Sequence, residues 1–324
     1  MEVGNVSQTI MRRSVLKQLQ NQTFDPQERC QIIPTEHDEV AATSSALAHG
    51  NQPSIVIYAI AKALNDLATR GAKAVAVSLQ INLPPRVREV RLKEMIQMAE
   101  SFCRELHVEI RGVQVEVMSF VSQFFVQATA MGTAKEQELM SIRAVKPGQE
   151  IVLCGYIGIE GMLRVVDEKE EELSKRFIPT FINQIKELKA LLAPLAVIDQ
   201  AKAETVAMHQ VGNGGIFAAL WELGEAAKVG MELTMSRISV KQETIEVCEC
   251  YHLDPYHMTS TGTILMITED ADRLIQRLQQ VGAHGSNLGM TTAEKARFLM
   301  QGEEKRFLDR PAQDELVRFD TVNR

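Results

Sequence analysis

The sequence predicts an α/β protein built from two domains. Segments with helical spacing of apolar residues alternate with short segments of strand character along the chain, which is typical of α/β folds. The length of 324 residues is more than one hydrophobic core commonly supports. Turn residues around 143–148 separate two groups of elements, so we expect one domain over 1–145 and another over 146–324.

The first domain is expected to contain a buried amphipathic helix. Ile57, Leu64 and Leu67 fall on one stripe of this helix, and Gly71 is placed to end it. The expected elements of this domain are, in order, a helix over 54–70, a strand over 73–81, a helix over 86–106, and strands over 108–118 and 123–132.

The second domain repeats the alternation. Two βαβ-like units of this size predict a ferredoxin-like layer. The expected strands are 150–155, 204–209, 230–238, 262–268 and 283–291, and the expected helices are 158–177, 179–192, 212–228, 242–251 and 269–281.

Composition limits the classes of function. The net charge of -7 and the lack of a basic patch argue against nucleic-acid binding. No apolar run reaches the roughly 18 residues that span a bilayer, and residues 1–20 lack the apolar core of a signal peptide, so we expect a cytoplasmic protein without a membrane partner. Five cysteines, an odd number, fit a reducing compartment.

Cys248 and Cys250 form a C-x-C pair that is followed by His252 and His257. One interpretation is a metal cluster. The alternative, which we favour, is a short helix over 243–251, because residues two apart on a helix face different directions and zinc sites use a wider cysteine spacing.

The clearest local signal is Gly212-Asn213-Gly214-Gly215, between an expected strand and an expected helix. Glycines there allow a ligand to approach the backbone, and the free N–H groups at a helix start favour an anion such as phosphate. The alternative is a tight strand-to-helix turn without a ligand. The chain has no P-loop motif of the G-x-x-x-x-G-K-[ST] type.

Three polar residues are further candidates. Asn65 and Asp66 lie beside the apolar stripe of the first helix, where a carboxylate can be buried beside a metal or a helix start. The alternative is an aspartate on the helix surface that pairs with a neighbour. His209 precedes the glycine turn and is either a general base or a hydrogen-bonded structural histidine.

Several segments together resemble the ATP-binding family of aminoimidazole ribonucleotide (AIR) synthase and the hydrogenase maturation factor HypE. Residues 64–72 (LNDLATRGA) are similar to the family motif N-D-[IL]-A-x-x-G-A, and residues 110–117 (IRGVQVEV) stand where the family has I-x-G-G-H-T-E-V. Met208-His209 with residues 214–233 resembles M-H-D-V-T-E-G-G and its helix. The opening (1–6 and 13–17), 243–255, 260–265 and 306–316 continue the likeness, which covers nearly the whole chain.

The resemblance implies a PurM-like fold, whose N-terminal α/β domain pairs with its copy in a homodimer and whose C-terminal α/β domain completes a groove for ATP and Mg²⁺. The family uses ATP to activate an amide-type oxygen. By this resemblance Asp66 is the metal position, and the cofactor-binding positions are Asn65, Asp66, Gly71, Gly112, Glu116, His209, Gly212, Asn213, Gly214 and Gly215.

Departures from the family fall on its acidic and glycine-rich positions. The glycine-rich G-x-G-E-D reads DPQERC at 25–30, and T-D-P reads Thr43-Ser44-Ser45. In D-V-T-E-G-G the acidic positions read Gln210 and Asn213, and the threonine reads Gly212. HypE proteins carry the modified group on a C-terminal cysteine, whereas no cysteine follows Cys250 here.

Two functions remain open. Mg²⁺ prefers hard oxygen ligands, so the lost acids predict that binding of ATP and Mg²⁺ is weak or lost. The interpretation we favour is a degenerate paralogue that serves as a binding or scaffold subunit in protein maturation, as a homodimer or as a heterodimer with an active relative. The alternative is an ATP-dependent enzyme of the family that acts on an unknown substrate.

Overall fold

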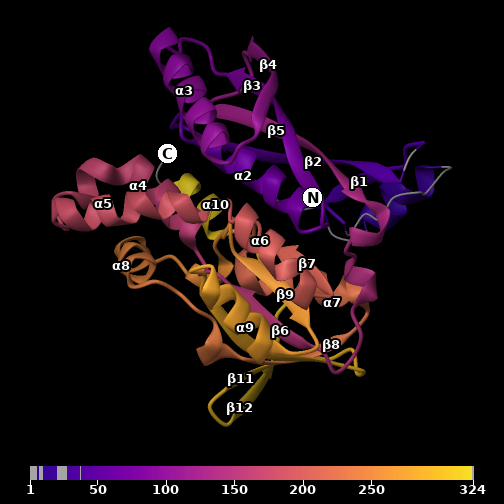
Figure 1. The fold of residues 1–324 in the computed structure, drawn as a ribbon. Helices are drawn as coiled ribbons and strands as arrows, with labels where there is room; N and C mark the ends of the chain where they lie inside the picture. Colours follow the sequence, from indigo (N-terminus) through magenta and orange to yellow (C-terminus); the bar gives the residue numbers. More distant parts are fainter. Residues whose placement is uncertain (1–5, 7–9, 20–27, 37, 323–324) are drawn as a thin grey trace.

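The computed structural model describes residues 6, 10–19, 28–36 and 38–322 and contains two β-sheets with helices packed against them (Figure 1). The mixed α/β class and the two-domain fold predicted from the sequence are confirmed. The N-terminal sheet ends at residue 135, and the first strand of the C-terminal sheet begins at residue 150.

The N-terminal sheet has the strand order β1-β2-β5-β3-β4. Among the described strands of this sheet, β3 and β4 pair in parallel and the other neighbours pair antiparallel. Alternate residues of β5 are buried, because one face of the sheet packs on a helix and the other is open. The strands are β1 Cys30–Ile33, β2 Glu39–Gly50, β3 Lys73–Leu83, β4 Glu109–Val117 and β5 Phe124–Lys135, and the helices are α2 Ile55–Ala68 and α3 Glu89–Glu105.

The C-terminal sheet has the order β12-β11-β8-β10-β6-β9-β7. Its strands are β6 Glu150–Cys154, β7 Ala207–Gln210, β8 Gly230–Thr234, β9 Ile264–Thr268, β10 Gly285–Thr292, β11 Arg297–Gln301 and β12 Glu304–Phe307. Its helices are α4 Ile159–Leu173, α5 Pro179–Glu187, α6 Leu195–Ala201, α7 Gly215–Ala227, α8 Gln242–Tyr251, α9 Ala271–Gln280 and α10 Glu315–Val322.

Short turns of other helix types complete the described elements. They are η1 Met11–Val15, η2 Leu16–Gln18, η3 Glu136–Glu138, η4 Ile142–Ala144, η5 Leu188–Leu191, η6 Lys202–Glu204, η7 Met235–Arg237 and η8 Pro255–His257.

The structure corrects several expected elements. Strand β2 was not expected, because its Ala and Ser residues lack the β-branched character that marks a strand. Strands β11 and β12 were also missed. The strand expected over 204–209 is restricted to β7, since 202–204 forms a 3₁₀ turn, and the strand expected over 230–238 ends at residue 234 for the same reason.

Helix α2 lies between the N-terminal sheet and the C-terminal domain, where it contacts α6 and β7 (Figure 1). One hydrophobic cluster joins Leu64 of α2, Met162 of α4 and Leu316 of α10. This cluster therefore joins the N-terminal sheet to helices of the C-terminal domain, while the strands of the C-terminal sheet pack in two other clusters. Within the described residues, no helix is long and apolar enough to cross a membrane.

Candidate functional site

The candidate site forms where α2 meets the C-terminal domain. Every residue of Ile55–Ala68 is buried, including Lys62, Asn65 and Asp66. Charged side chains are rarely buried without a partner, because the loss of hydration is costly. The polar residues of α2 therefore depend on partners from other segments.

An amide network holds Asp66. The side chain of Asn65 donates from Nδ2 to the carbonyl oxygen of Leu192 at 2.7 Å and to Gln210 Oε1 at 2.8 Å. Because a carbonyl oxygen only accepts, Asn65 must present Nδ2, and Gln210 then presents Oε1 to it. Gln210 Nε2 is left to donate to Asp66 Oδ1 at 2.7 Å. The network thus fixes an N–H group, rather than an oxygen, against the carboxylate.

Arg29 links Asp66 to helix α7. Its Nη1 lies 3.8 Å from Asp66 Oδ1, and its Nη2 donates to Glu222 Oε2 at 2.6 Å. His209 Nε2 lies 3.1 Å from the same Glu222 oxygen. Burial raises the pKa of Asp66, although Arg29 and the Gln210 hydrogen bond partly offset the effect. Burial also opposes ionisation of Glu222, but Arg29 and His209 outweigh it and lower the pKa of Glu222 to about 2.

A second ion pair contacts Asn213 of the glycine turn. Lys62 Nζ lies 2.8 Å from Glu160 Oε1 and donates to Asn213 Oδ1 at 3.2 Å. Thr259 and Thr261 donate to Glu160 Oε2 at 2.9 and 2.5 Å. Burial by itself would raise the pKa of Glu160, but the Lys62 ammonium and the Arg164 guanidinium lower it overall, so the carboxylate stays ionised.

The glycine turn already holds a carboxylate of the chain itself. Gly214 N–H donates to Asp314 Oδ2 at 2.7 Å, and Gly215 N–H donates to the Gly212 carbonyl. Positive φ angles of +82° and +70° require glycine at 214 and 215, and a Cβ on Gly215 would overlap the Tyr256 carbonyl. The sequence suggested a spot depleted of acids, whereas Asp314 stands there. Binding of an outside anion stays a prediction and requires Asp314 to move.

Mg²⁺ does not fit these residues. Mg²⁺ needs several oxygen ligands in near-octahedral geometry. Asp66, the metal position implied by the resemblance, instead faces an amide N–H of Gln210 and the guanidinium of Arg29. In the part of the chain that the structure describes, no three His, Cys, Asp or Glu side chains gather as a metal-binding group.

The structure brings together only some of the residues predicted from the sequence. Asn65, Asp66, His209 and residues 212–215 lie in one region, as described above. Gly71, Gly112 and Glu116 lie elsewhere. Gly71 has φ +91° in the turn after α2, where a Cβ would overlap the Glu138 carbonyl. Gly112 packs on Ser78, and Glu116 is exposed on the edge strand β4 opposite Asn82.

The other sequence motifs also take structural positions. Thr43-Ser44-Ser45 lies in the middle of β2, and Ser44 is buried. Within the C-x-C pair, Cys248 Sγ contacts Met258 Sδ at 3.6 Å, while Cys250 Sγ donates to the Glu246 carbonyl. Burial raises the pKa of the Cys248 thiol to about 12, which disfavours the thiolate that a metal requires. Residues 1–5 and 25–27, which carry parts of two other motifs, lie outside the described residues.

Sequence reasoning missed five residues of the site. Lys62 had a usable signal, because a lone charge in the apolar segment IVIYAIAKAL indicates a buried partner. The others come from distant segments and gave no local signal. They are Arg29, Glu160, Glu222 and Asp314.

Comparison with known families matches both domains. The N-terminal domain model of AIR synthase-related proteins matches residues 30–134, and the C-terminal domain model matches residues 146–300. A curated relative, carbamoyl dehydratase HypE of Rhizobium leguminosarum bv. viciae, is 24% identical over 252 residues, which cover 76% of this chain and 70% of that protein.

Solved structures share the fold. ThiL complexed with AMPPCP and TMP superposes with a TM-score of 0.73 at 11% identity, covering 95% of this chain and 99% of that chain. The hydrogenase maturation protein HypE in complex with ATP superposes with a TM-score of 0.67 at 15% identity, covering 96% of each chain. At these identities the likeness extends to the fold.

The depressed pKa of Glu222 predicts a stability that depends on pH. The ionised Glu222 carboxylate stabilises the fold fully above its ordinary pKa of about 4.5. This stabilisation is lost as the pH falls toward the pKa of about 2 that Glu222 has in the folded chain. We expect Glu222→Gln to lower the free energy of unfolding by about 2 kcal/mol at pH 6. In urea titrations, the difference from the unmodified chain should shrink toward pH 3.

The matched control is Glu232→Gln, which removes an exposed partner of Lys305 and should have little effect at either pH. If the difference in free energy of unfolding between Glu222→Gln and the unmodified chain stays constant from pH 6 to pH 3, the low pKa of Glu222 is contradicted.

The Asp314 contact predicts a latent anion site. Asp314→Ala frees the Gly214 N–H at the start of α7, so inorganic phosphate should bind about tenfold more tightly, in line with a hydrogen bond to a charged group. Calorimetric titration at pH 7 measures this, with Asp38→Ala, an exposed acid between β1 and β2, as the control. An unchanged phosphate affinity in a folded Asp314→Ala variant would leave the turn with a packing role alone.

Proposed function

Since the chain belongs to the AIR synthase-related protein family, we propose that it is a non-catalytic member that serves as a binding or scaffold subunit in protein maturation. One observation carries the proposal. The buried acids at the domain junction are already matched by the chain's own donors, Asp66 by Gln210 and Arg29, and Glu160 by Lys62.

The chemistry of the replaced positions supports this reading. A nucleotide site that uses Mg²⁺ needs free carboxylates to hold the metal against the phosphates. Gln210 and Asn213 stand at two positions where the family carries acids, and both are engaged with residues of α2. Phosphates and metal would have to displace these contacts before any transfer step.

The alternative is an active ATP-dependent enzyme that acts on an unknown substrate. Its support is Asn65 Oδ1, a buried oxygen next to Asp66 that has no hydrogen-bond partner among the residues that the structure describes. An unmatched buried acceptor costs free energy, and a ligand donor would satisfy it. HypE and ThiL, which share the fold, are both described in complexes with ATP or its analogue.

The two functions predict different nucleotide binding. For a scaffold, calorimetric titration with Mg-ATP should give a Kd weaker than about 1 mM, and no phosphate should be released. The double variant Gln210→Asp with Asn213→Glu restores acids at two family positions and should bind Mg²⁺ more tightly than the unmodified chain. Micromolar, metal-dependent ATP binding with turnover by the unmodified chain would favour the enzyme instead.

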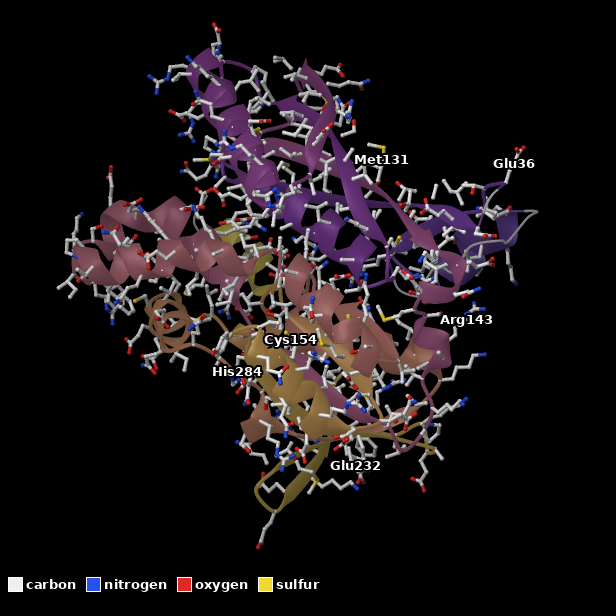
Figure 2. The ribbon with its side chains drawn as sticks, viewed as in Figure 1. Glu36, Met131, Arg143, Cys154, Glu232 and His284 are labelled. Atoms are coloured by element: carbon white, nitrogen blue, oxygen red, sulfur yellow. The ribbon has the colours of Figure 1, made fainter. Side chains whose placement is uncertain are left out.

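We further propose that the open face of the N-terminal sheet joins two copies of this chain. On β2, the residues that alternate with the buried ones include Thr43, Ser45 and Leu47, and none between residues 41 and 49 carries a carboxylate, ammonium or guanidinium group. Leu47 is 42% exposed and Met131 of β5 is 36% exposed. Figure 2 shows Met131 on the outer side of the sheet. An open sheet face with little charge favours burial against a partner.

Pairing through the open face of the N-terminal sheet predicts that charged residues introduced on this face separate the two copies. Met131→Lys combined with Leu47→Lys should convert the dimer to a monomer at micromolar concentration, because two ammonium groups would be buried without partners. Light scattering after size exclusion measures the mass. The control Val90→Lys places a lysine at an exposed apolar position of α3. A monomeric unmodified chain would contradict the proposal.

A further inference from the structure

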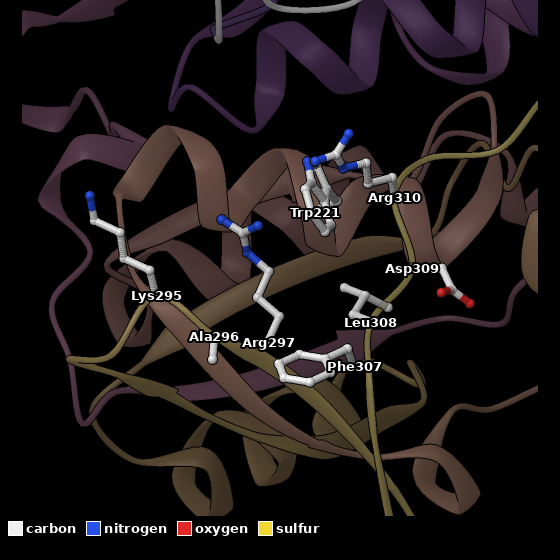
Figure 3. A pocket seen from close by; sticks show the side chains of 8 residues that line it. All are labelled: Trp221, Lys295, Ala296, Arg297, Phe307, Leu308, Asp309 and Arg310. Carbon is white, nitrogen blue, oxygen red and sulfur yellow. The ribbon is translucent and has the colours of Figure 1, made fainter.

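A cavity of about 320 Å³ lies on the C-terminal domain, away from the network around Asp66 (Figure 3). It opens to solvent, and it is lined by helix α7, by the start of β11 with the two residues before it, and by the end of β12 with the segment that follows. Its volume falls at the lower end of the range for small-molecule sites, about 300–1,000 Å³. The side chains that matter for binding are Trp221, Lys295, Arg297, Phe307, Asp309 and Arg310.

The wall of the cavity contains a buried guanidinium. Arg297 is only 7% exposed, because Gly224 of α7 has no side chain and a Cβ there would overlap Arg297 Nε. The guanidinium carbon lies 4.6 Å from the centre of the Trp221 ring, and Nη2 donates to Glu225 at 2.7 Å. Arg297 Nε is buried and has no hydrogen-bond partner among the described residues. A buried donor without an acceptor is rare and costly.

The charge balance of the lining favours an anion. Glu225 matches Arg297, which leaves Lys295 and Arg310 against the single carboxylate of Asp309. Both cations are exposed, and neither has an ion-pair partner in the described part of the chain. In Figure 3, the Arg310 guanidinium lies at the Trp221 end of the cavity, and Lys295 lies at the opposite end. An anion is attracted to such a site because two unmatched positive charges outnumber one negative charge.

Aromatic side chains form the remaining wall. Phe307 is 68% exposed and is held in place by Phe298, whose ring centre lies 4.9 Å away. Trp221 presents its ring from α7. Two aromatic surfaces beside cationic groups are suited to a flat ring that carries a negative charge.

We propose that this cavity binds a small anion that carries a flat ring, with its carboxylate or phosphate directed at Arg310 and the ring between Trp221 and Phe307. Lys295 adds positive charge at the opposite end of the cavity. The cavity shares no residue with the network around Asp66. The proposal is therefore independent of whether that region binds ATP.

The sequence provides a direct reporter, because Trp221 is the only tryptophan of the chain. Benzoate and phenyl phosphate are the probes, and each is titrated into the full chain while tryptophan emission is recorded at 295 nm excitation. Benzyl alcohol tests the ring without the charge, and acetate tests the charge without the ring. We expect saturable changes with benzoate or phenyl phosphate, and at least about fivefold weaker effects with benzyl alcohol and acetate. The tighter of the two anions identifies the acidic group.

Arg310→Gln removes one exposed cation of the cavity, and Arg104→Gln removes an exposed cation of α3 as the matched control. The expected result is an affinity for the tighter probe that is about fivefold weaker in Arg310→Gln and within about twofold of the unmodified chain in Arg104→Gln. Three results would overturn the proposal: no change of emission with either anion, equal effects of benzoate and benzyl alcohol, or unchanged affinity in Arg310→Gln.

Discussion

The burial of α2 between the two domains is the constraint on which the candidate site depends. All fourteen residues from Ile55 to Ala68 are buried, although the segment contains an ammonium and a carboxylate. Removing such ions from water costs several kcal/mol each, and only close partners offset the cost. Lys62 must therefore meet Glu160, which is itself fully buried, and Asp66 must meet Gln210 and Arg29. Helix α2 can be buried between the domains because other segments of the chain supply these partners.

Gln210 shows how one residue type changes the electrostatics of this junction. A carboxylate in its place would stand within hydrogen-bonding distance of Asp66, and two like charges so close would raise the pKa of one of them unless a cation lay between. The amide removes that repulsion and donates a hydrogen bond at 2.7 Å. Its orientation is set by Asn65 and, through Asn65, by the Leu192 carbonyl. The amide N–H thus contacts Asp66 at a position where a second carboxylate would need a cation to offset the repulsion.

The sequence predicts those features that depend on neighbours along the chain. Helix α2 and strand β3 have clear apolar periodicity, and the polar pair Asn65 and Asp66 was placed on the correct helix. Strand β2 was missed because small residues satisfy its packing against α2 without β-branched side chains. Arg29 and Glu222 form a hydrogen bond across 193 positions, so no local pattern connects them. Which charges pair depends on the tertiary fold. That a buried charge needs a partner can be inferred from the sequence at Lys62, which is a lone charge in an apolar segment.

The glycine turn at 212–215 shows that a sequence motif can indicate a close approach to the backbone without identifying the group that approaches. Glycine indicates that something approaches the backbone closely, and a phosphate is one such group. Here the approaching groups belong to the chain. A Cβ on Gly212 would lie 2.8 Å from Arg29 Nη1, and one on Gly214 would lie 3.3 Å from the Ala312 carbonyl. Gly212 therefore admits the guanidinium that reaches Asp66, and Gly214 admits the segment that carries Asp314. These glycines let two distant parts of the chain, Arg29 and the segment that carries Asp314, meet at the start of α7.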